Sequence, residues 1–213
     1  VSLEVLEFLV RQYPDSVKEK SNDGRIPFHF ACENNAPLQV LKFLVQMYPD
    51  SVKEKHNWGR LPLHIACDNN APLDILEFLV QQYPGSVKEK DKELKLPVHY
   101  SCKQNAPLQV LKFLVQQYPD SLKEKDKHRR LPLDLACLNN APLQELRFLV
   151  QVYLDSVKKQ KDNLGRLPLH FACEKMAPLK VVNFLVQQYP DSLKETDNQE
   201  KLPLHYACEN NAP

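Results

Sequence analysis

The stretch LPLHIACDNNAP, from Leu61 to Pro72, recurs along the whole chain and decides the fold. Close copies begin at Ile26, Leu96, Leu131, Leu167 and Leu202, and their prolines are spaced 35, 35, 35, 36 and 35 residues apart. A second phrase, whose clearest copy is APLQVLKFLVQQYPDSLKEKD from Ala106, lies between these copies. A sequence period of this length indicates a solenoid or a propeller.

The second phrase predicts an amphipathic helix from Pro107 to Tyr118. Its apolar residues recur at helical spacing: Leu108, Val110, Leu111, Leu114, Val115 and Tyr118. Polar residues fill the other side of the same helix, as in a helix that packs on one face. Pro107 suits the first helical position, and Pro119 is expected to end the helix because the residue before a proline avoids the helical region.

The first phrase predicts a shorter helix that begins at Pro62. Asn69 and Asn70 are expected to close it, because asparagine tolerates the left-handed conformation that usually calls for glycine. Each unit is then a short helix, a tight turn, a longer helix and a polar return loop. No alternating strand pattern is present to form propeller blades, so we expect an all-α helix-turn-helix solenoid with protruding finger loops.

A helix pair of this size cannot bury its own apolar face, and stacking on neighbours buries it instead. We therefore expect one array of about six repeats over residues 1–213, with repeats that start near 26, 61, 96, 131, 167 and 202. Residues 1–13 read as a second helix without a first, and the chain ends where another second helix should start. We expect a fragment of a longer array, with soft ends.

Composition is ordinary for a folded protein, with 43% hydrophobic and 26% charged residues and a net charge of +1. The balanced charge argues against a general nucleic-acid binder, which usually carries a strong basic excess. No apolar run approaches the ~18 residues of a membrane span. We therefore expect no specific nucleic-acid partner and no membrane association.

The unit resembles the ankyrin repeat, whose pattern runs D-x-x-G-x-T-P-L-H-x-A-A followed by a turn and L-E-V-V-x-x-L-L. Residues 56–67, HNWGRLPLHIAC, match most of the first part, and Asp162-Asn163-Leu164-Gly165 keeps the D-x-x-G finger intact. The resemblance covers the whole chain. It implies a helix-turn-helix solenoid whose finger loops and first helices line one concave face that binds other proteins.

The copies depart from that pattern at two places. Leucine or isoleucine replaces the threonine before the helix-opening proline, so the usual hydroxyl cap of the first helix is missing. The fingertip glycine survives as Gly24, Gly59 and Gly165, whereas Leu94, Arg129 and Glu200 take its place elsewhere.

The repeated histidine and cysteine, such as His64 and Cys67, have a chemical and a structural interpretation. A structural zinc site needs four converging ligands, and each repeat offers two. A catalytic pair is needed once, not in five copies, and also needs an orienting group and a pocket. The resemblance implies that the histidine bonds the neighbouring repeat's backbone, while the cysteine packs as a small apolar residue. Asp134 replaces histidine in one copy, which fits the structural interpretation because the repeat tolerates the loss of histidine. We therefore expect no enzyme activity, no metal and no cofactor.

All six cysteines occupy one position of the unit. Stacked repeats would separate equivalent atoms by about 10 Å, whereas a disulfide requires Cα atoms within roughly 7 Å. We expect reduced thiols and a reducing compartment, the cytoplasm or the nucleus.

Two further recurring features also have two interpretations. The alternating charges of Lys18-Glu19-Lys20 and its copies could bind phosphates or form a solvated face, and the repeated Phe and Tyr of the second helix could stack on bases or pack between repeats. We favour the structural alternative for both, because the charges alternate in sign and the aromatic spacing is regular.

Positions that differ among the copies are released from the demands of the fold. They lie at the fingertips and on the first helix, where the resemblance places the binding face. The candidate partner-binding residues are Asp23, Trp58, Asp68, Glu93, Tyr100, Lys103, His128, Arg129, Leu138, Leu164 and Gln199. Trp58 stands out as the only tryptophan, a residue type enriched at binding hot spots.

The expected function is a non-catalytic protein–protein interaction module. The alternatives are a purely architectural spacer, or the recognition arm of a larger enzyme or signalling protein. The expected partner is a protein. A monomer is expected, with weak end-to-end association as an alternative.

Overall fold

The computed structural model describes residues 3–158 and 160–210, and every regular element within them is a helix. The all-α prediction is thus confirmed. Backbone contacts divide the chain into two compact units, Val1–Pro97 and Val98–Pro213. One continuous array over residues 1–213 stays a prediction.

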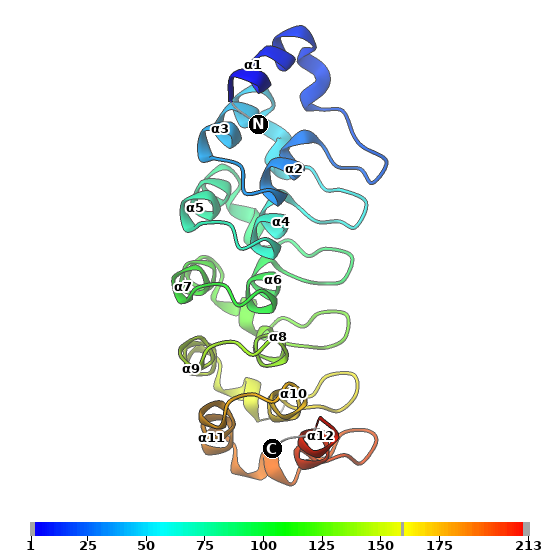
Figure 1. Cartoon of the computed structure of the whole chain (residues 1–213), viewed down its shortest axis with the longest axis vertical. Helices are drawn as coiled ribbons and strands as arrows, with labels where there is room; N and C mark the ends of the chain where they lie inside the picture. Colours follow the sequence, from blue (N-terminus) through cyan, green and yellow to red (C-terminus); the bar gives the residue numbers. More distant parts are fainter. Residues whose placement is uncertain (1–2, 159, 211–213) are drawn as a thin grey trace. The chain divides into compact units, whose positions relative to one another are not determined.

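The first unit alternates short and long helices (Figure 1). The long ones are α1 (Leu3–Gln12), α3 (Leu38–Met47) and α5 (Leu73–Gln82), and the short ones are α2 (Pro27–Glu33) and α4 (Pro62–Asp68). A 3-10 helix follows each long helix: η1 (Pro14–Val17), η2 (Pro49–Lys53) and η3 (Pro84–Lys88).

The second unit repeats this order. Its short helices are α6 (Pro97–Lys103), which begins at the boundary, α8 (Pro132–Leu138), α10 (Pro168–Glu174) and α12 (Pro203–Glu209). Its long helices are α7 (Leu108–Gln117), α9 (Leu143–Val152) and α11 (Leu179–Gln188), and its 3-10 helices are η4 (Pro119–Lys123), η5 (Leu154–Val157) and η6 (Pro190–Leu193). In each unit the finger loops project on the side of the short helices (Figure 1).

Prolines lie at or next to the first residue of the short helix α4 and of the long helix α7, but the predicted position of Pro107 is wrong. Pro62 opens α4 as expected. Pro107 does not occupy the first helical position of α7 but precedes it, with ψ of 148°. Pro119 ends that helix and at the same time opens η4, a 3-10 helix in a segment that we expected to be a loop.

The turn between the short and long helices uses the predicted left-handed asparagine. The φ angle is 51° at Asn70 and 56° at Asn140. Asn140 Nδ2 also donates to the carbonyl of Lys175 in the next repeat, at 2.9 Å, and Asn35 Nδ2 donates to that of Asn69 at the same distance. This asparagine therefore closes its own helix and joins neighbouring repeats.

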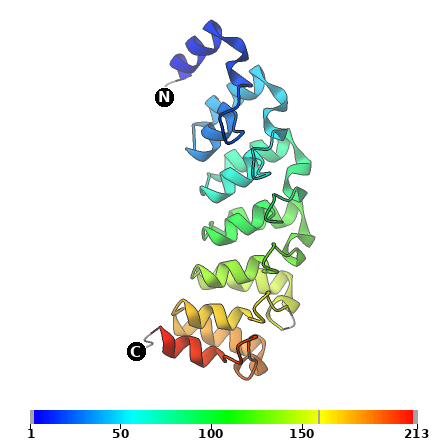
Figure 2. The same ribbon diagram turned by 90° about the vertical axis from the view of Figure 1, so that its right-hand side faces the viewer.

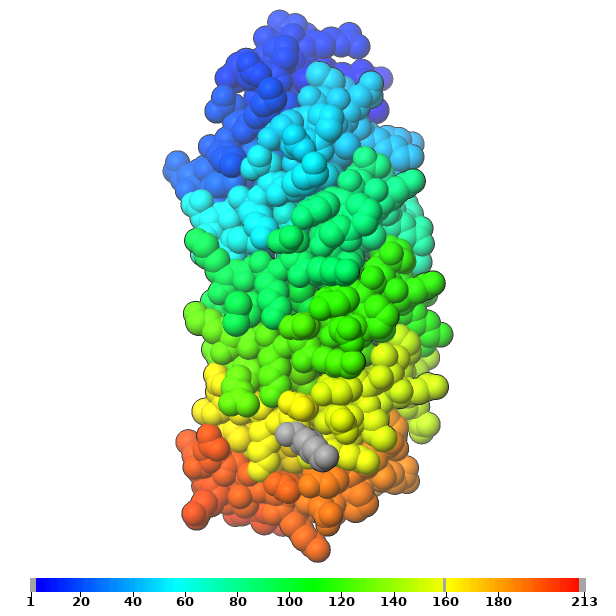
Figure 3. All heavy atoms as spheres, turned by 180° about the vertical axis from the view of Figure 1, so that it is seen from behind, coloured from blue at the N-terminus to red at the C-terminus, as the bar shows by residue number. Residues whose placement is uncertain are grey.

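The core of each unit lies between the two layers of helices. In α7 the buried residues are Val110, Leu111, Leu114 and Val115, as the helical spacing predicts. Within each unit, the side chains of successive repeats lie against each other, as the bands of colour show from behind (Figure 3). The aromatic packing prediction fails at the start of the chain, where Phe8 is 61% exposed, because the described residues place no further repeat over α1.

The alternating charges pair between repeats instead of forming an unpaired basic stripe. Lys20 bonds Glu54 at 2.9 Å, and Lys55 bonds Glu89 at 2.8 Å. The hydroxyl of Tyr48 also donates to Glu54, at 2.7 Å, and the Lys20 bond, followed by this one, lowers the pKa of Glu54. None of the helices in the described residues is long and apolar enough to cross a membrane.

Candidate partner-binding face

Four of the finger loops are anchored at their bases by a buried aspartate. In the fifth finger, Asp162 Oδ1 accepts the backbone N–H groups of Leu164 and Arg166 at 2.9 and 2.8 Å. Asp91, Asp126 and Asp197 repeat these bonds in other fingers. Because the carboxylate satisfies two turn donors, the finger has a defined shape before any partner binds.

Neighbouring fingers are joined through their backbones. In the first unit, Asn57 N–H donates to the Asp23 carbonyl at 2.9 Å, and Lys92 N–H donates to that of Trp58 at 3.1 Å. In the second unit, Asn163 N–H donates to the His128 carbonyl at 3.0 Å. Figure 2 views the molecule from the finger side. Each unit therefore presents its fingers as a linked row.

The fingertip turn keeps its conformation where glycine is lost. The φ angle is 76° at Gly59 and 79° at Gly165, and it is 57° at Leu94 and 60° at both Arg129 and Glu200. A left-handed conformation is unfavourable for residues with a Cβ atom. These three side chains are thus held at the tips at some cost in backbone strain.

Trp58 lies at the tip of the second finger and is 56% exposed. The backbone N–H of Trp58 donates to Nδ1 of the buried His56 at 3.0 Å, and the two rings meet edge to face with centroids 5.6 Å apart. Burial, followed by the charges of Arg25 and Arg60, lowers the pKa of His56. The turn thus uses the backbone of Trp58, and more than half of its side-chain surface is open to a partner.

A basic residue at the finger base pairs with an acidic residue at the end of the first helix. The pairs are Arg25–Glu33 at 2.8 Å, Arg60–Asp68 at 3.2 Å, Arg166–Glu174 at 3.0 Å and Lys201–Glu209 at 2.6 Å. The guanidinium carbons of Arg25 and Arg166 also lie 5.5 and 4.4 Å from the ring centroids of Phe30 and Phe171. This pair therefore ties four of the fingers to their own helices.

The candidate residues occupy three kinds of position. The exposed ones are Trp58, His128, Arg129, Leu164 and Gln199; the partly exposed ones are Asp23, Asp68, Glu93, Lys103 and Leu138. Asp23 and Asp68 are engaged in the chain's own ion pairs, to Arg25 and Arg60. Only part of the candidate set is thus open to a partner.

Tyr100 is wrong as a candidate contact, because it is fully buried. The same position is 5% exposed at Ile65 and 0% exposed at Phe171, although it reaches 41% at Phe30. Variation among large apolar residues at this position therefore reflects packing in the interior repeats.

The repeated histidine is a structural element. His64 is fully buried; its Nδ1 accepts the N–H of Leu61 at 3.1 Å, and its Nε2 donates to the Glu89 carbonyl of the next repeat at 3.0 Å. In the preceding repeat, His29 Nδ1 likewise accepts the N–H of Ile26, and its Nε2 donates to the Glu54 carbonyl. The histidine thus satisfies the backbone N–H that precedes the first helix, in a repeat that lacks a threonine hydroxyl at this place.

Burial shifts the pKa values of the repeated histidine and cysteine away from their ordinary values. It lowers the pKa of His29 and of His64 to about 4, and it raises the pKa of Cys173 to about 11. Cys32, Cys67, Cys102 and Cys137 are buried, and Cys208 is exposed. In the described residues, no three His, Cys, Asp or Glu side chains are grouped to hold a metal ion.

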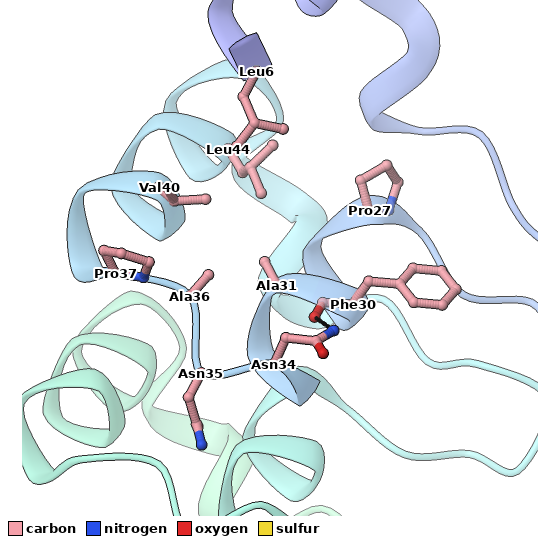
Figure 4. Close-up of a pocket in the computed structure, with 10 residues that line it drawn as sticks. All are labelled: Leu6, Pro27, Phe30, Ala31, Asn34, Asn35, Ala36, Pro37, Val40 and Leu44. Carbon is pink, nitrogen blue, oxygen red and sulfur yellow. Dashed lines mark hydrogen bonds between the residues drawn. The ribbon is translucent and has the colours of Figure 1, made fainter. Parts of the chain in front are cut away.

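An apolar hollow of about 630 Å³ lies beside α2 in the first unit (Figure 4). Its lining includes Leu6, Ala31, Val40 and Leu44. The corresponding face of α4 is covered by α2, which packs against it. Among the described residues no short helix covers α2 in this way, and nothing in the structure shows what fills the hollow.

A family model described as ankyrin repeats (3 copies) matches residues 2–91 and matches again at residues 98–197. No curated protein sequence matches the chain significantly.

Proposed function

Because the chain belongs to the ankyrin-repeat family, whose members are generally protein–protein interaction modules, we propose that it binds a protein partner through the face formed by its first helices and finger loops. The family is typically non-catalytic, and we propose a non-catalytic role for this chain. The cysteines of the described residues form no disulfide, which supports a reducing compartment, the cytoplasm or the nucleus.

The observation that carries the proposal is the placement of Trp58. Its backbone completes a fixed finger, while its indole is 56% exposed on a row of linked fingertips. An ordered loop loses little conformational freedom when it binds, which favours affinity. An exposed tryptophan offers a large contact area at such a place.

Replacing Trp58 by alanine should weaken binding without unfolding the chain. We expect a loss of about 2 kcal/mol in affinity, typical of a hot-spot aromatic residue. The free energy of unfolding should change by only about 0.5 kcal/mol, as for other exposed residues. Loss of the contact between the Trp58 and His56 rings adds a small further decrease. The measurement is quantitative mass spectrometry of proteins retained by immobilised wild-type and Trp58→Ala chains, followed by the affinity of the retained partner.

Met47→Ala is the matched control, because Met47 is 40% exposed at the end of the long helix α3, away from the finger loops. It should retain the same partner as wild type. An architectural spacer would show no protein that distinguishes Trp58→Ala from wild type, and that result would contradict the proposed face. A retained partner with its own catalytic activity would favour the alternative of a recognition arm in a larger assembly.

A further inference from the structure

The fourth finger lacks the acidic half of the ion pair that ties other fingers to their helices. Arg130 takes the place of Arg25, Arg60 and Arg166, but Leu138 takes the place of the paired acid. Among the described residues, the only ion-pair partner of Arg130 is Asp126 on the same finger.

The guanidinium of Arg130 is nevertheless held in the same arrangement as that of Arg166. Its Nε and Nη2 donate to Asp126 Oδ2 at 3.0 and 2.8 Å. The Nε and Nη2 of Arg166 donate to Asp162 Oδ2 at 3.1 and 3.0 Å, which leaves Nη1 for Glu174. By this internal comparison, Nη1 of Arg130 is the donor that has no carboxylate from its own helix.

The surroundings of this donor strengthen its attraction for an anion. The side chain of Arg130 is only 17% exposed, so its charge is partly shielded from water. His128 and Arg129 are exposed on the same finger, and the backbone bond from Asn163 to His128 joins that finger to the next. Ionic hydrogen bonds from a planar, partly buried guanidinium are among the stronger polar contacts in proteins.

We propose that Arg130 and Leu138 form a docking site for an acidic protein segment, in which one carboxylate bonds Nη1 of Arg130 and a neighbouring apolar side chain packs on Leu138. This inference rests on the proposed function and names the chemistry of the partner. The bound carboxylate replaces the one that Glu33, Asp68, Glu174 and Glu209 supply within other repeats.

A carboxylate fits this place better than a phosphate does. The chain itself fills the equivalent corner with a carboxylate in each of the four pairs. The carboxylate of Asp126 already occupies the other edge of Arg130, and a doubly charged phosphate beside it would be repelled more strongly. The apolar Leu138 suits a protein segment and adds nothing for a nucleic-acid backbone.

Leu138→Glu tests the site because it should restore the internal pair and block the site without disturbing the fold. A random peptide library is first selected on the wild-type chain, and we expect aspartate or glutamate to be enriched beside an apolar residue. A fluorescein-labelled copy of a selected peptide is then titrated by fluorescence polarisation. We expect Leu138→Glu to lower its affinity by about tenfold or more, with an unfolding transition at least as stable as that of wild type.

Three controls test whether binding depends on the negative charge of the peptide and not only on its shape. Replacing the peptide's acidic residue by its amide should cause a similar loss with the wild-type chain. Leu138→Gln, which supplies no carboxylate to Nη1 of Arg130, should bind more tightly than Leu138→Glu. Adding Glu174→Leu to Leu138→Glu should restore binding, because Arg166 is then released as Arg130 is in the wild type.

Selection without acidic enrichment, or equal affinity of wild type and Leu138→Glu for the peptide, would overturn the site. Tighter binding of a labelled single-stranded oligonucleotide or of a phosphorylated peptide would overturn the choice of a carboxylate. If Trp58→Ala loses the cellular partner while Leu138→Glu keeps it, the proposed function stands and this inference fails.

Discussion

Acidification from about pH 7 to about pH 4 should destabilise the chain through its buried histidines. His64 accepts the N–H of Leu61 at Nδ1, so a proton on that nitrogen would place two donors face to face. Burial lowers the pKa of His64 to about 4 and outweighs the opposing attraction of Asp91. The folded state therefore binds the proton less readily than the unfolded chain does.

The sign and the size of this effect follow from linkage. A histidine whose pKa is about 6.5 unfolded and about 4 folded contributes stability above 6.5, and that stability is lost as the pH falls through 4. Each of His29 and His64 then accounts for a loss on the order of 3 kcal/mol. Urea unfolding curves at several pH values measure the loss.

His64→Asn is the informative variant, because an amide oxygen can accept the Leu61 N–H but does not titrate in this range. It should be less stable than wild type at pH 7 and should lose less stability on acidification. His128→Ala, at an exposed fingertip, is the matched control and should keep the wild-type pH dependence. An equal pH dependence in wild type and His64→Asn would contradict the structural role of the histidine.

Asp134→His should stabilise the chain by about 1–3 kcal/mol at neutral pH, the usual cost of a buried polar group that lacks a partner. Asp134 is fully buried; its Oδ2 accepts the Leu131 N–H at 2.8 Å, while its Oδ1 has no hydrogen-bond partner. Burial raises the pKa of Asp134 well above its usual range, and the charges of Asp162 and Asp126 raise it further. Histidine would supply the same acceptor to Leu131 without a buried carboxyl group.

The pH dependence distinguishes this effect from a change in packing. A carboxyl group whose pKa is raised on folding gives its full stability below about 3.8, and that stability is lost as the pH rises toward the folded pKa. The advantage of Asp134→His in urea unfolding should therefore grow from about pH 4 to pH 7. Asp155→His makes the same change at an exposed site and should move stability by less than about 0.5 kcal/mol. A destabilised Asp134→His chain would show that this repeat is adapted to aspartate.

Periodicity predicted the helices because each repeat has the same apolar spacing. It missed the 3-10 helices, since the short phrase Pro119 to Lys123 contains turn residues and reads as a loop. It placed Pro107 one position too far into its helix. A proline just before a helix and a proline at its first position produce the same sequence pattern, a proline followed by apolar residues at helical spacing.

The candidate site was only partly predictable. Variation among repeats found Trp58, which is exposed, and also Tyr100, which is not, because the core tolerates several large apolar residues. The missing pair of Arg130 was not apparent, since Leu138 lies eight positions away, on a helix, and only the folded Arg166–Glu174 pair shows that the two positions meet. Leu138 was predicted as a candidate without its partner.

Hydrogen exchange on the wild-type chain, with and without the selected acidic peptide, tests most directly whether departures from the repeat form the binding face. The peptide should slow exchange in the fourth finger, at residues 124–131, and in α8, and leave the long helices α7 and α9 unchanged. Slowed exchange confined to the long helices or to the 3-10 helices would contradict the account, because those elements belong to the repeated scaffold.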